Sequence, residues 1–184
     1  MVLSNRGLSL VNSGHTNKPV INQYDTVSSS LIIGLLKSAD TLGLSAKHCA
    51  ERIGLEDQVM KDPTTRVTYK VLIAVLDDVY DQSNHNRNLG IELGKQLIPG
   101  SYSALGYAAA SCETLGEAIK VIPQYEDVTL TTGKTTLMAA GDRVSLSWTS
   151  TRKPYSQILE EVILSSWVTL ARTLTSKDSL DINV

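Results

Sequence analysis

Residues Val128–Trp148 read VTLTTGKTTLMAAGDRVSLSW, and within this stretch the spacing of apolar residues changes from that of a helix to that of a strand. Apolar and polar residues alternate in three short runs, which Thr132-Gly133-Lys134 and Gly141-Asp142 separate. Alternation with a period of two is typical of a strand with one buried face, and short gaps that contain glycine are typical of hairpin turns. The stretch therefore predicts a three-stranded antiparallel β-meander with one solvated face. Its alternating apolar residues are Val128, Leu130, Leu137, Ala139, Val144, Leu146 and Trp148.

A long amphipathic helix is predicted immediately after the meander. Apolar residues recur there every three or four positions, as on one face of a helix, over about twenty residues. This stripe comprises Tyr155, Leu159, Val162, Ile163, Trp167, Leu170 and Leu174. We expect the helix to bury the stripe against the dry face of the meander, because each needs an apolar partner.

The chain upstream of the meander is predicted to be mostly helical. Helical spacing of apolar residues marks segments near residues 31–39, 46–53, 72–83, 89–97, 102–111 and 115–122. Ser45 and Gly54 are placed to cap the second of these, and Thr114-Leu115-Gly116-Glu117 has the form of a capping box at the start of the last. Pro123 predicts a bend or stop near residues 121–125. The sequence thus predicts an α+β fold that is mostly helical, with a small antiparallel β-meander packed against a long C-terminal helix.

The two ends of the chain differ from this pattern. Residues 1–27 are rich in Asn, Ser, Gly and Thr and have no sustained period, so we expect a poorly ordered arm before a domain that covers residues 28–184. At the other end, Leu180, Ile182 and Val184 alternate with polar residues as at the start of a strand. We expect from this alternation that the polypeptide is cut from a longer protein.

Composition narrows the class of protein. The 184 residues carry a formal net charge of -2, which argues against a dedicated nucleic-acid binder, since such proteins carry a basic excess. Cys49 and Cys112 form no CxxC pair, which fits a reducing compartment. No apolar run approaches the roughly 20 residues that span a bilayer, and Met1–Leu10 lacks the core of a signal peptide. We therefore expect a cytoplasmic protein without a membrane partner.

The motifs favour neither an enzyme nor a cofactor. Thr132-Gly133-Lys134-Thr135 is similar to the end of a phosphate-binding loop, but Val128 stands where that loop needs a glycine, so a hairpin turn is the favoured interpretation. The histidines lack the i+4 partner of a metal site, and no GxSxG nucleophile elbow occurs. Asp77, Asp78 and Asp81 are interpreted as a solvated helix face rather than as paired catalytic carboxylates.

The segment Leu31–Leu55 supports a second interpretation. A helix, a short turn through Gly43-Leu44-Ser45 and another short helix have the form of a helix-turn-helix DNA reader. The polar residues of its second helix are Lys47, His48, Glu51 and Arg52. A helix with such balanced charge gains little from the release of counterions on DNA. Direct DNA binding by this segment is therefore the alternative rather than the leading hypothesis.

An ordered set of short motifs is similar to a known family. The motifs are Gly54-Leu55, Asp62-Pro63, Arg66-Val67, Leu89-Gly90-Ile91-Glu92-Leu93-Gly94, Leu105-Gly106-Tyr107-Ala108, Ser111-Cys112-Glu113-Thr114-Leu115-Gly116-Glu117-Ala118 and Tyr125. In this order and spacing they resemble the N-terminal regulatory domain of AraC-type transcription regulators, in the subgroup with an arabinose-binding-like domain. The resemblance runs from Ser28 to Val184.

The resemblance implies a sensor and dimerisation domain of a bacterial-type regulator. Such a domain binds a small-molecule effector, forms a homodimer and controls a C-terminal pair of helix-turn-helix motifs. That DNA-binding part has no counterpart in this sequence, so we expect DNA contacts only through a domain that is not present here. The family name does not establish arabinose as the ligand, because members of the subgroup respond to varied small molecules.

An effector pocket is expected to be mostly apolar, with a few convergent polar groups. We expect its walls to be the meander, the final helix and the helix of small residues near residues 102–111. The candidate effector-binding residues are Tyr102, Tyr107, Tyr125, Trp148 and Arg152. The broad apolar stripe of the final helix also suggests a dimer interface around Trp167. No catalytic residue, metal ligand or cofactor is predicted.

Overall fold

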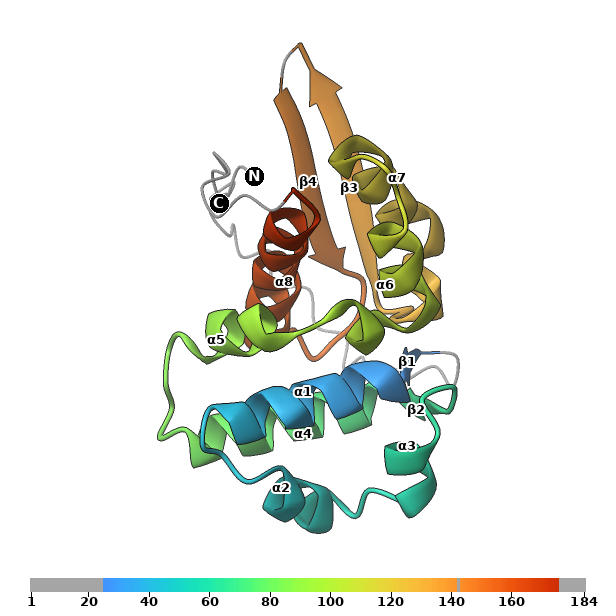
Figure 1. Cartoon of the computed structure of the whole chain (residues 1–184). Coiled ribbons are helices and arrows are strands. Elements are labelled where there is room, and N and C mark those ends of the chain that lie inside the picture. Colours follow the sequence, from blue (N-terminus) through green and yellow to red (C-terminus); the bar gives the residue numbers. More distant parts are fainter. Residues whose placement is uncertain (1–24, 142, 176–184) are drawn as a thin grey trace, which may run out of the picture.

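The structure has two layers, which α5 joins (Figure 1). It is a computed structural model and describes residues 25–141 and 143–175. The first layer contains β1 (Thr26–Ser28), α1 (Ser29–Thr41), α2 (Ala46–Ile53), α3 (Asp57–Lys61), β2 (Arg66–Thr68) and α4 (Tyr69–Gln82). After α5 (Leu89–Gln96) and the 3-10 helix η1 (Pro99–Tyr102), the second layer contains α6 (Ser103–Ala110), α7 (Leu115–Tyr125), the 3-10 helix η2 (Glu126–Val128), β3 (Gly133–Ala140), β4 (Arg143–Ser150) and α8 (Gln157–Thr175). The predicted α+β class, helical majority and long C-terminal helix are confirmed.

The helix ends predicted from capping residues are confirmed. Ser45 Oγ accepts a hydrogen bond from the backbone N–H of His48, and Gly54 ends α2 with a left-handed φ of 71°. Thr114 and Glu117 form the expected reciprocal capping box at the start of α7. Pro123 lies in the last turn of α7, which ends two residues later and continues as η2. Local chemistry therefore determines where these helices begin and end.

The predicted three-stranded meander is wrong in its first strand. β3 and β4 form a two-stranded antiparallel hairpin in which Leu137 pairs with Leu146. Val128 ends η2 instead, and Leu130 makes a single isolated bridge to Val27. The segment Thr132-Gly133-Lys134 is therefore no hairpin turn, because β3 already begins at Gly133.

A buried carboxylate explains why residues 128–130 do not form a third strand. Glu126 is only 7% exposed, and its carboxylate accepts a hydrogen bond from the backbone N–H of Thr135 at 2.9 Å. This bond draws the start of β3 back to η2, so the residues between them turn over instead of lying beside β3. A contact between residues nine positions apart leaves no trace in the apolar periodicity, which is why the sequence pattern did not indicate it.

The N-terminal boundary predicted at residue 28 falls inside β1. Val27 is fully buried. The backbone carbonyl oxygen of Asp25 accepts a hydrogen bond from the backbone N–H of Tyr69 at 2.9 Å. β1 pairs antiparallel with β2, with Thr26 opposite Thr68. Strands of three residues are too short for a period to be recognised. The rest of the predicted arm, residues 1–24, and the strand expected from Leu180 lie outside the described residues.

The core lies between α1, α4, α5 and α8. Two glycines bring the backbones of α5 and α8 into contact. The largest fully buried side chains are Leu31, Ile32, Leu35, Leu36, Leu72, Leu76, Leu89, Leu93, Leu159, Val27, Val75 and Val79. A Cβ atom on Gly94 would lie 2.4 Å from the carbonyl oxygen of Val162, and one on Gly90 would lie 2.7 Å from that of Ile158. The backbones of α5 and α8 therefore touch, and α8 packs mainly on α5 while it also contacts β4.

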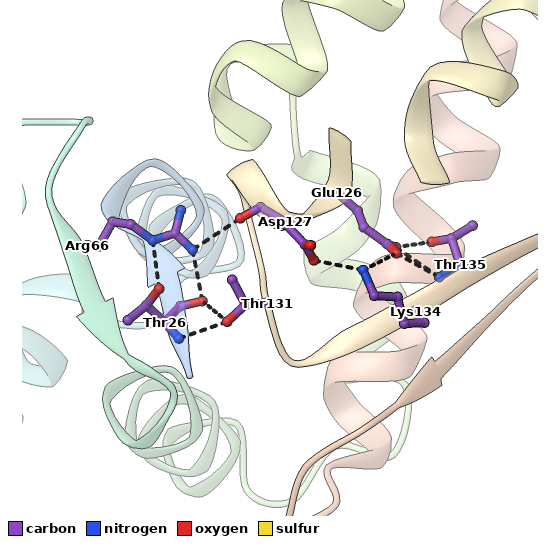
Figure 2. Close-up of polar contacts among 7 residues, drawn as sticks. All are labelled: Thr26, Arg66, Glu126, Asp127, Thr131, Lys134 and Thr135. Carbon is purple, nitrogen blue, oxygen red and sulfur yellow. Dashed lines mark hydrogen bonds and ion pairs between the residues drawn. The ribbon is translucent and has the colours of Figure 1, made fainter. Parts of the chain in front are cut away.

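Two polar clusters connect η2 to both sheets (Figure 2). In the first, the guanidinium of Arg66 on β2 donates to both oxygens of Thr26 on β1, at 2.7 and 3.0 Å, and to the carbonyl oxygen of Val128 at 2.5 Å. In the second, Lys134 Nζ lies 3.4 Å from the buried Glu126 carboxylate and 2.9 Å from that of Asp127. A buried carboxylate is tolerated only when it is paired in this way. These clusters hold the two layers together at the end opposite to the turn between α4 and α5.

Substitution of Gly94 by alanine tests the backbone contact between α5 and α8. The added methyl group must separate the two helices, so we expect the free energy of unfolding to fall by roughly 2–3 kcal/mol. The control is Gly116→Ala on α7, where the nearest atom is 3.9 Å from a Cβ. That change should raise the free energy of unfolding by about 0.5 kcal/mol. Urea unfolding of both variants provides the measurement, and equal effects would contradict the contact.

Substitution of Arg66 by alanine tests the first polar cluster. It removes charge-assisted hydrogen bonds that join β1, β2 and η2, so we expect the free energy of unfolding to fall by about 2 kcal/mol. Arg143→Ala at the exposed end of the hairpin is the matched control, with an expected change within about 0.5 kcal/mol. A loss at Arg66 no larger than the loss at Arg143 would show that the cluster contributes nothing to stability.

Candidate functional site

An apolar cavity lies beneath α8. A cavity of about 310 Å³ opens between α5, η1, α6 and α8. A second cavity of about 200 Å³ between α7, β4 and α8 adjoins it, and the two share Ile122, Trp167 and Leu170. We call the two together the α8 cavity. A size near 300 Å³ and a mostly apolar lining are typical of sites for small molecules.

The lining of the α8 cavity comes from α5, η1, α6, α7, β4 and α8. The first cavity is lined by Lys95, Gln96, Leu97, Ile98, Pro99, Tyr102, Leu105, Gly106, Ala109, Ile122, Ser166, Trp167, Thr169, Leu170 and Thr173. The second is lined by Leu115, Ala118, Ile119, Ile122, Val144, Leu146, Trp167, Val168, Leu170, Ala171 and Leu174. Ala109 is a small residue of this lining, and a Cβ atom on Gly106 would lie 1.8 Å from the carbonyl oxygen of Pro99. The expected walls were the meander, the final helix and the small-residue helix, and β4, α8 and α6 all line this cavity.

One hydrogen-bonded pair supplies the buried polar groups of this lining. The Tyr102 hydroxyl donates to Ser166 Oγ, which donates in turn to the carbonyl oxygen of Ile163 at 2.7 Å. Burial raises the pKa of the Tyr102 phenol well above its usual range, so the phenol stays protonated and remains a donor. Among the described lining residues of both cavities, the one charged side chain is the exposed Lys95 at the mouth. The cavity can therefore enclose an apolar body with few polar groups.

The structure brings two of the six predicted residues to this cavity. Tyr102 and Trp167 both line it. Trp167 had been predicted at a dimer interface, but its half-buried ring lies on the cavity side of α8. Tyr107 is 64% exposed, because it lies two residues from both Leu105 and Ala109 and thus on the opposite side of α6. α6 therefore buries one face only, through Leu105, Gly106 and Ala109.

The other three predicted residues lie elsewhere. Tyr125, at the end of α7, is 53% exposed and points to no described cavity wall. The indole of Trp148 packs over Gly133, where a Cβ atom would come within 1.9 Å of the ring. Arg152 Nε donates to the buried carboxylate of Asp25 at 2.6 Å, so its role in the structure is an ion pair with the N-terminal layer.

Sequence reasoning missed the serine that pairs with Tyr102. Ser166 is 3% exposed and lies between the buried Ile163 and the cavity residue Leu170 on one side of α8. A polar residue inside an apolar helical stripe is the signal that would have indicated a buried hydrogen bond. Ile122 and Leu170 gave no such signal, because an apolar residue that lines a cavity looks the same in sequence as one that fills a core.

The helix-turn-helix interpretation finds little support in the charges of α2. Arg52 lies 3.0 Å from Asp78 and 3.6 Å from Asp81, and Lys47 pairs with Glu51 at 3.8 Å. The expectation that all three aspartates are solvated is wrong for Asp78, which is 3% exposed beside Arg52. The cations of α2 therefore already have carboxylate partners, which lowers their value for binding phosphates.

Two further findings concern partners. In the part of the chain that the structure describes, no helix is both long and apolar enough to cross a bilayer. Within the same residues, no cluster of three or more histidine, cysteine, aspartate or glutamate side chains is arranged to hold a metal ion.

Comparison with known proteins identifies the family. The model of the arabinose-binding domain of AraC transcription regulators, an N-terminal domain, matches residues 43–183. No curated protein matches the chain. The matched segment contains α5, η1, α6, α7, β4 and α8, and thus every element that lines the α8 cavity. It covers well over half of the 184 residues, and the predicted resemblance is confirmed. The chain belongs to the family of N-terminal arabinose-binding domains of AraC transcription regulators.

Proposed function

We propose that this chain is the effector-sensing domain of a transcription regulator and that its effector binds in the α8 cavity. The observation that carries the proposal is the cavity itself, a space of about 310 Å³ with an apolar lining and one buried hydroxyl pair, Tyr102 and Ser166. The family consists of regulatory domains and not of enzymes, so no catalytic role is proposed. DNA contacts are assigned to a separate C-terminal domain, in agreement with the N-terminal position of this family in its regulators.

The chemistry of the lining favours an apolar effector over a sugar. Each hydroxyl group of a bound sugar would need a hydrogen-bonding partner, since an unpaired buried polar group costs about 1–3 kcal/mol. The hydroxyls of Thr169 and Thr173 already donate to carbonyl oxygens of their own helix, at 3.0 and 2.9 Å. Leucine, isoleucine, valine, alanine and tryptophan side chains form most of the remaining wall.

The charge of the lining also favours one polar group on the effector rather than several. A free amino acid carries both an ammonium and a carboxylate, and the described lining offers no carboxylate to its ammonium. Lys95 at the mouth matches a single anionic group. The proposed effector is therefore a compact hydrocarbon or aromatic body with one carboxylate or hydroxyl group.

We further propose that two copies of the chain associate through a surface away from the α8 cavity. The support is the family, whose resemblance implies a dimerisation domain, together with the position of Trp167 inside the cavity wall. An effector and a second copy then use different sides of the domain.

A thermal unfolding screen tests the effector proposal. Decanoate, decanol and indole-3-carboxylate represent the proposed class, and L-arabinose and L-arginine represent sugars and amino acids. At a hundred times its dissociation constant, a ligand adds about 2.7 kcal/mol, which corresponds to a rise of roughly 5–10 °C in the midpoint. We expect this rise with at least one member of the proposed class, and no rise with L-arabinose or L-arginine.

A matched pair of variants on α6 locates the binding site. Ala109 lines the α8 cavity and is 1% exposed, so Ala109→Leu should fill the space and abolish the ligand-induced rise. Ala108 is exposed on the same helix, and Ala108→Leu should leave the rise unchanged. A rise that persists in a folded Ala109→Leu variant would place the ligand elsewhere, and a rise with L-arabinose alone would overturn the proposed chemistry.

A further inference from the structure

A separate pocket lies beside α1. It has a volume of about 390 Å³ and is lined by residues of α1, α3, the end of α5, η1 and α6. Gln96 and Ile98 border both this pocket and the α8 cavity, so the segment that contains them lies between the two spaces. We call this space the α1 pocket.

The charged side chains of the α1 pocket are basic. Lys37 and Lys61 line it, and none of the described lining residues is acidic. Lys61 is paired with Asp57 at 2.8 Å. Lys37 belongs to no ion pair in the part of the chain that the structure describes. Its ammonium group is therefore available to an anion.

A buried hydroxyl group with an unused donor also lines the α1 pocket. Ser101 is 5% exposed, and its Oγ accepts one long hydrogen bond, from the backbone N–H of Ile98 at 3.4 Å. Within residues 25–141 and 143–175, this hydroxyl donates to no acceptor. The buried hydroxyls of Ser30 and Ser38 in the same lining donate to carbonyl oxygens, at 2.8 and 2.9 Å. Because a buried donor without an acceptor costs free energy, Ser101 favours a ligand that accepts its proton.

Two glycines bring three donor side chains to one turn of the chain. A Cβ atom on Gly34 would lie 2.6 Å from Ser101 Oγ, and Lys37 lies one helical turn after Gly34 on the same side of α1. A Cβ atom on Gly100 would lie 2.8 Å from the hydroxyl oxygen of Tyr107. Gly100 and Ser101 are neighbours in η1, so the ammonium of Lys37 and both hydroxyls gather around this turn. Tyr107, which does not reach the α8 cavity, thus lines the α1 pocket.

Apolar side chains complete the α1 pocket. Met60, Ile98 and Tyr107 all line it, and they are 38%, 66% and 64% exposed. A ligand with an apolar part would remove some of this surface from water, which is favourable. The pocket therefore offers hydrogen-bond donors and a free cation next to apolar surface.

We propose that the α1 pocket binds a phosphate monoester of a small apolar or aromatic alcohol. The phosphate group has three strong acceptor oxygens, which match the donors of Lys37, Ser101 and Tyr107. A carboxylate has two oxygens and would leave one of these donors unused. Met60 and Ile98 then contact the organic part of the ligand. This inference is independent of the effector proposed for the α8 cavity.

The reactivity of Lys37 reports whether the pocket is occupied. Acylation of the full chain by an N-hydroxysuccinimide ester, followed by mass spectrometry, gives the rate at Lys37 relative to the exposed Lys120 on α7. Phenyl phosphate should slow this relative rate, with a half-effect at about 1 mM or below. A chain without protection by phenyl phosphate would overturn the site. Inorganic phosphate or benzoate that protects Lys37 at the same concentration would overturn the assigned ligand class.

Substitutions identify the donors by calorimetric titration with phenyl phosphate. Lys37→Gln should raise the dissociation constant about tenfold or more, and Ser101→Ala should raise it about threefold or more, because each removes a hydrogen bond to a charged group. Lys120→Gln removes the same charge outside the pocket and should leave the dissociation constant unchanged. A folded Lys37→Gln variant with wild-type affinity would overturn the α1 pocket.

The Ala109→Leu variant separates this site from the α8 cavity. It fills the α8 cavity, so the proposal expects its affinity for phenyl phosphate to equal that of the wild type. Loss of phenyl phosphate binding in this variant would place the ligand in the α8 cavity and overturn the α1 pocket. Failure of the α1 pocket in either titration leaves the thermal screen of the α8 cavity unaffected.

Discussion

The absence of side chains at Gly90 and Gly94 is the constraint on which the second layer depends. Because these glycines let the backbones of α5 and α8 touch, the rotation of α8 about its own axis is fixed. One side of α8 is then committed to the core through Leu159 and Val162, and an adjoining side carries Ser166 and Leu170 into the α8 cavity. The remaining side carries the exposed Arg172 near the end of the helix. A single close contact thus fixes which residues of α8 face the core, the cavity and the solvent.

The polar clusters around η2 connect the two layers through a short segment with little regular structure. Arg66 donates to the backbone oxygens of Thr26, Asp127 and Val128, and its planar guanidinium suits several acceptors at once. On the other side, Glu126 accepts hydrogen bonds from the backbone N–H and the hydroxyl of Thr135 on β3. Apolar contacts alone are not directional and would leave the angle between the layers loosely defined.

Sequence patterns predicted the elements whose causes are local. Ser45, Gly54 and the Thr114–Glu117 box act within one helical turn, so α2 and α7 could be placed from the chain alone. The turn at Glu126 and the burial of Asp78 depend on partners from other elements, and no local pattern reports them. The family resemblance, by contrast, rests on many positions at once, so the error in the first strand of the meander did not affect it.

The residues of the candidate site also fall into those whose positions follow from local sequence and those whose positions depend on distant partners. Helical periodicity already separates Tyr107 from Leu105 and Ala109, so its exposure on α6 was open to prediction from the chain. Trp148 and Arg152 are different, because their partners Gly133 and Asp25 are brought to them only by the folded chain. The sequence alone could not show whether Tyr102 is buried or exposed, because a phenol suits both environments. The contact between Gly34 on α1 and Ser101 in η1, where a Cβ would lie only 2.6 Å from Ser101 Oγ, extends the tight packing from α8 through α5 and η1 into the first layer. Because closely packed elements cannot move independently, a molecule that displaced α8 would also displace α1, which packs through Gly34 against the cavity residue Leu97.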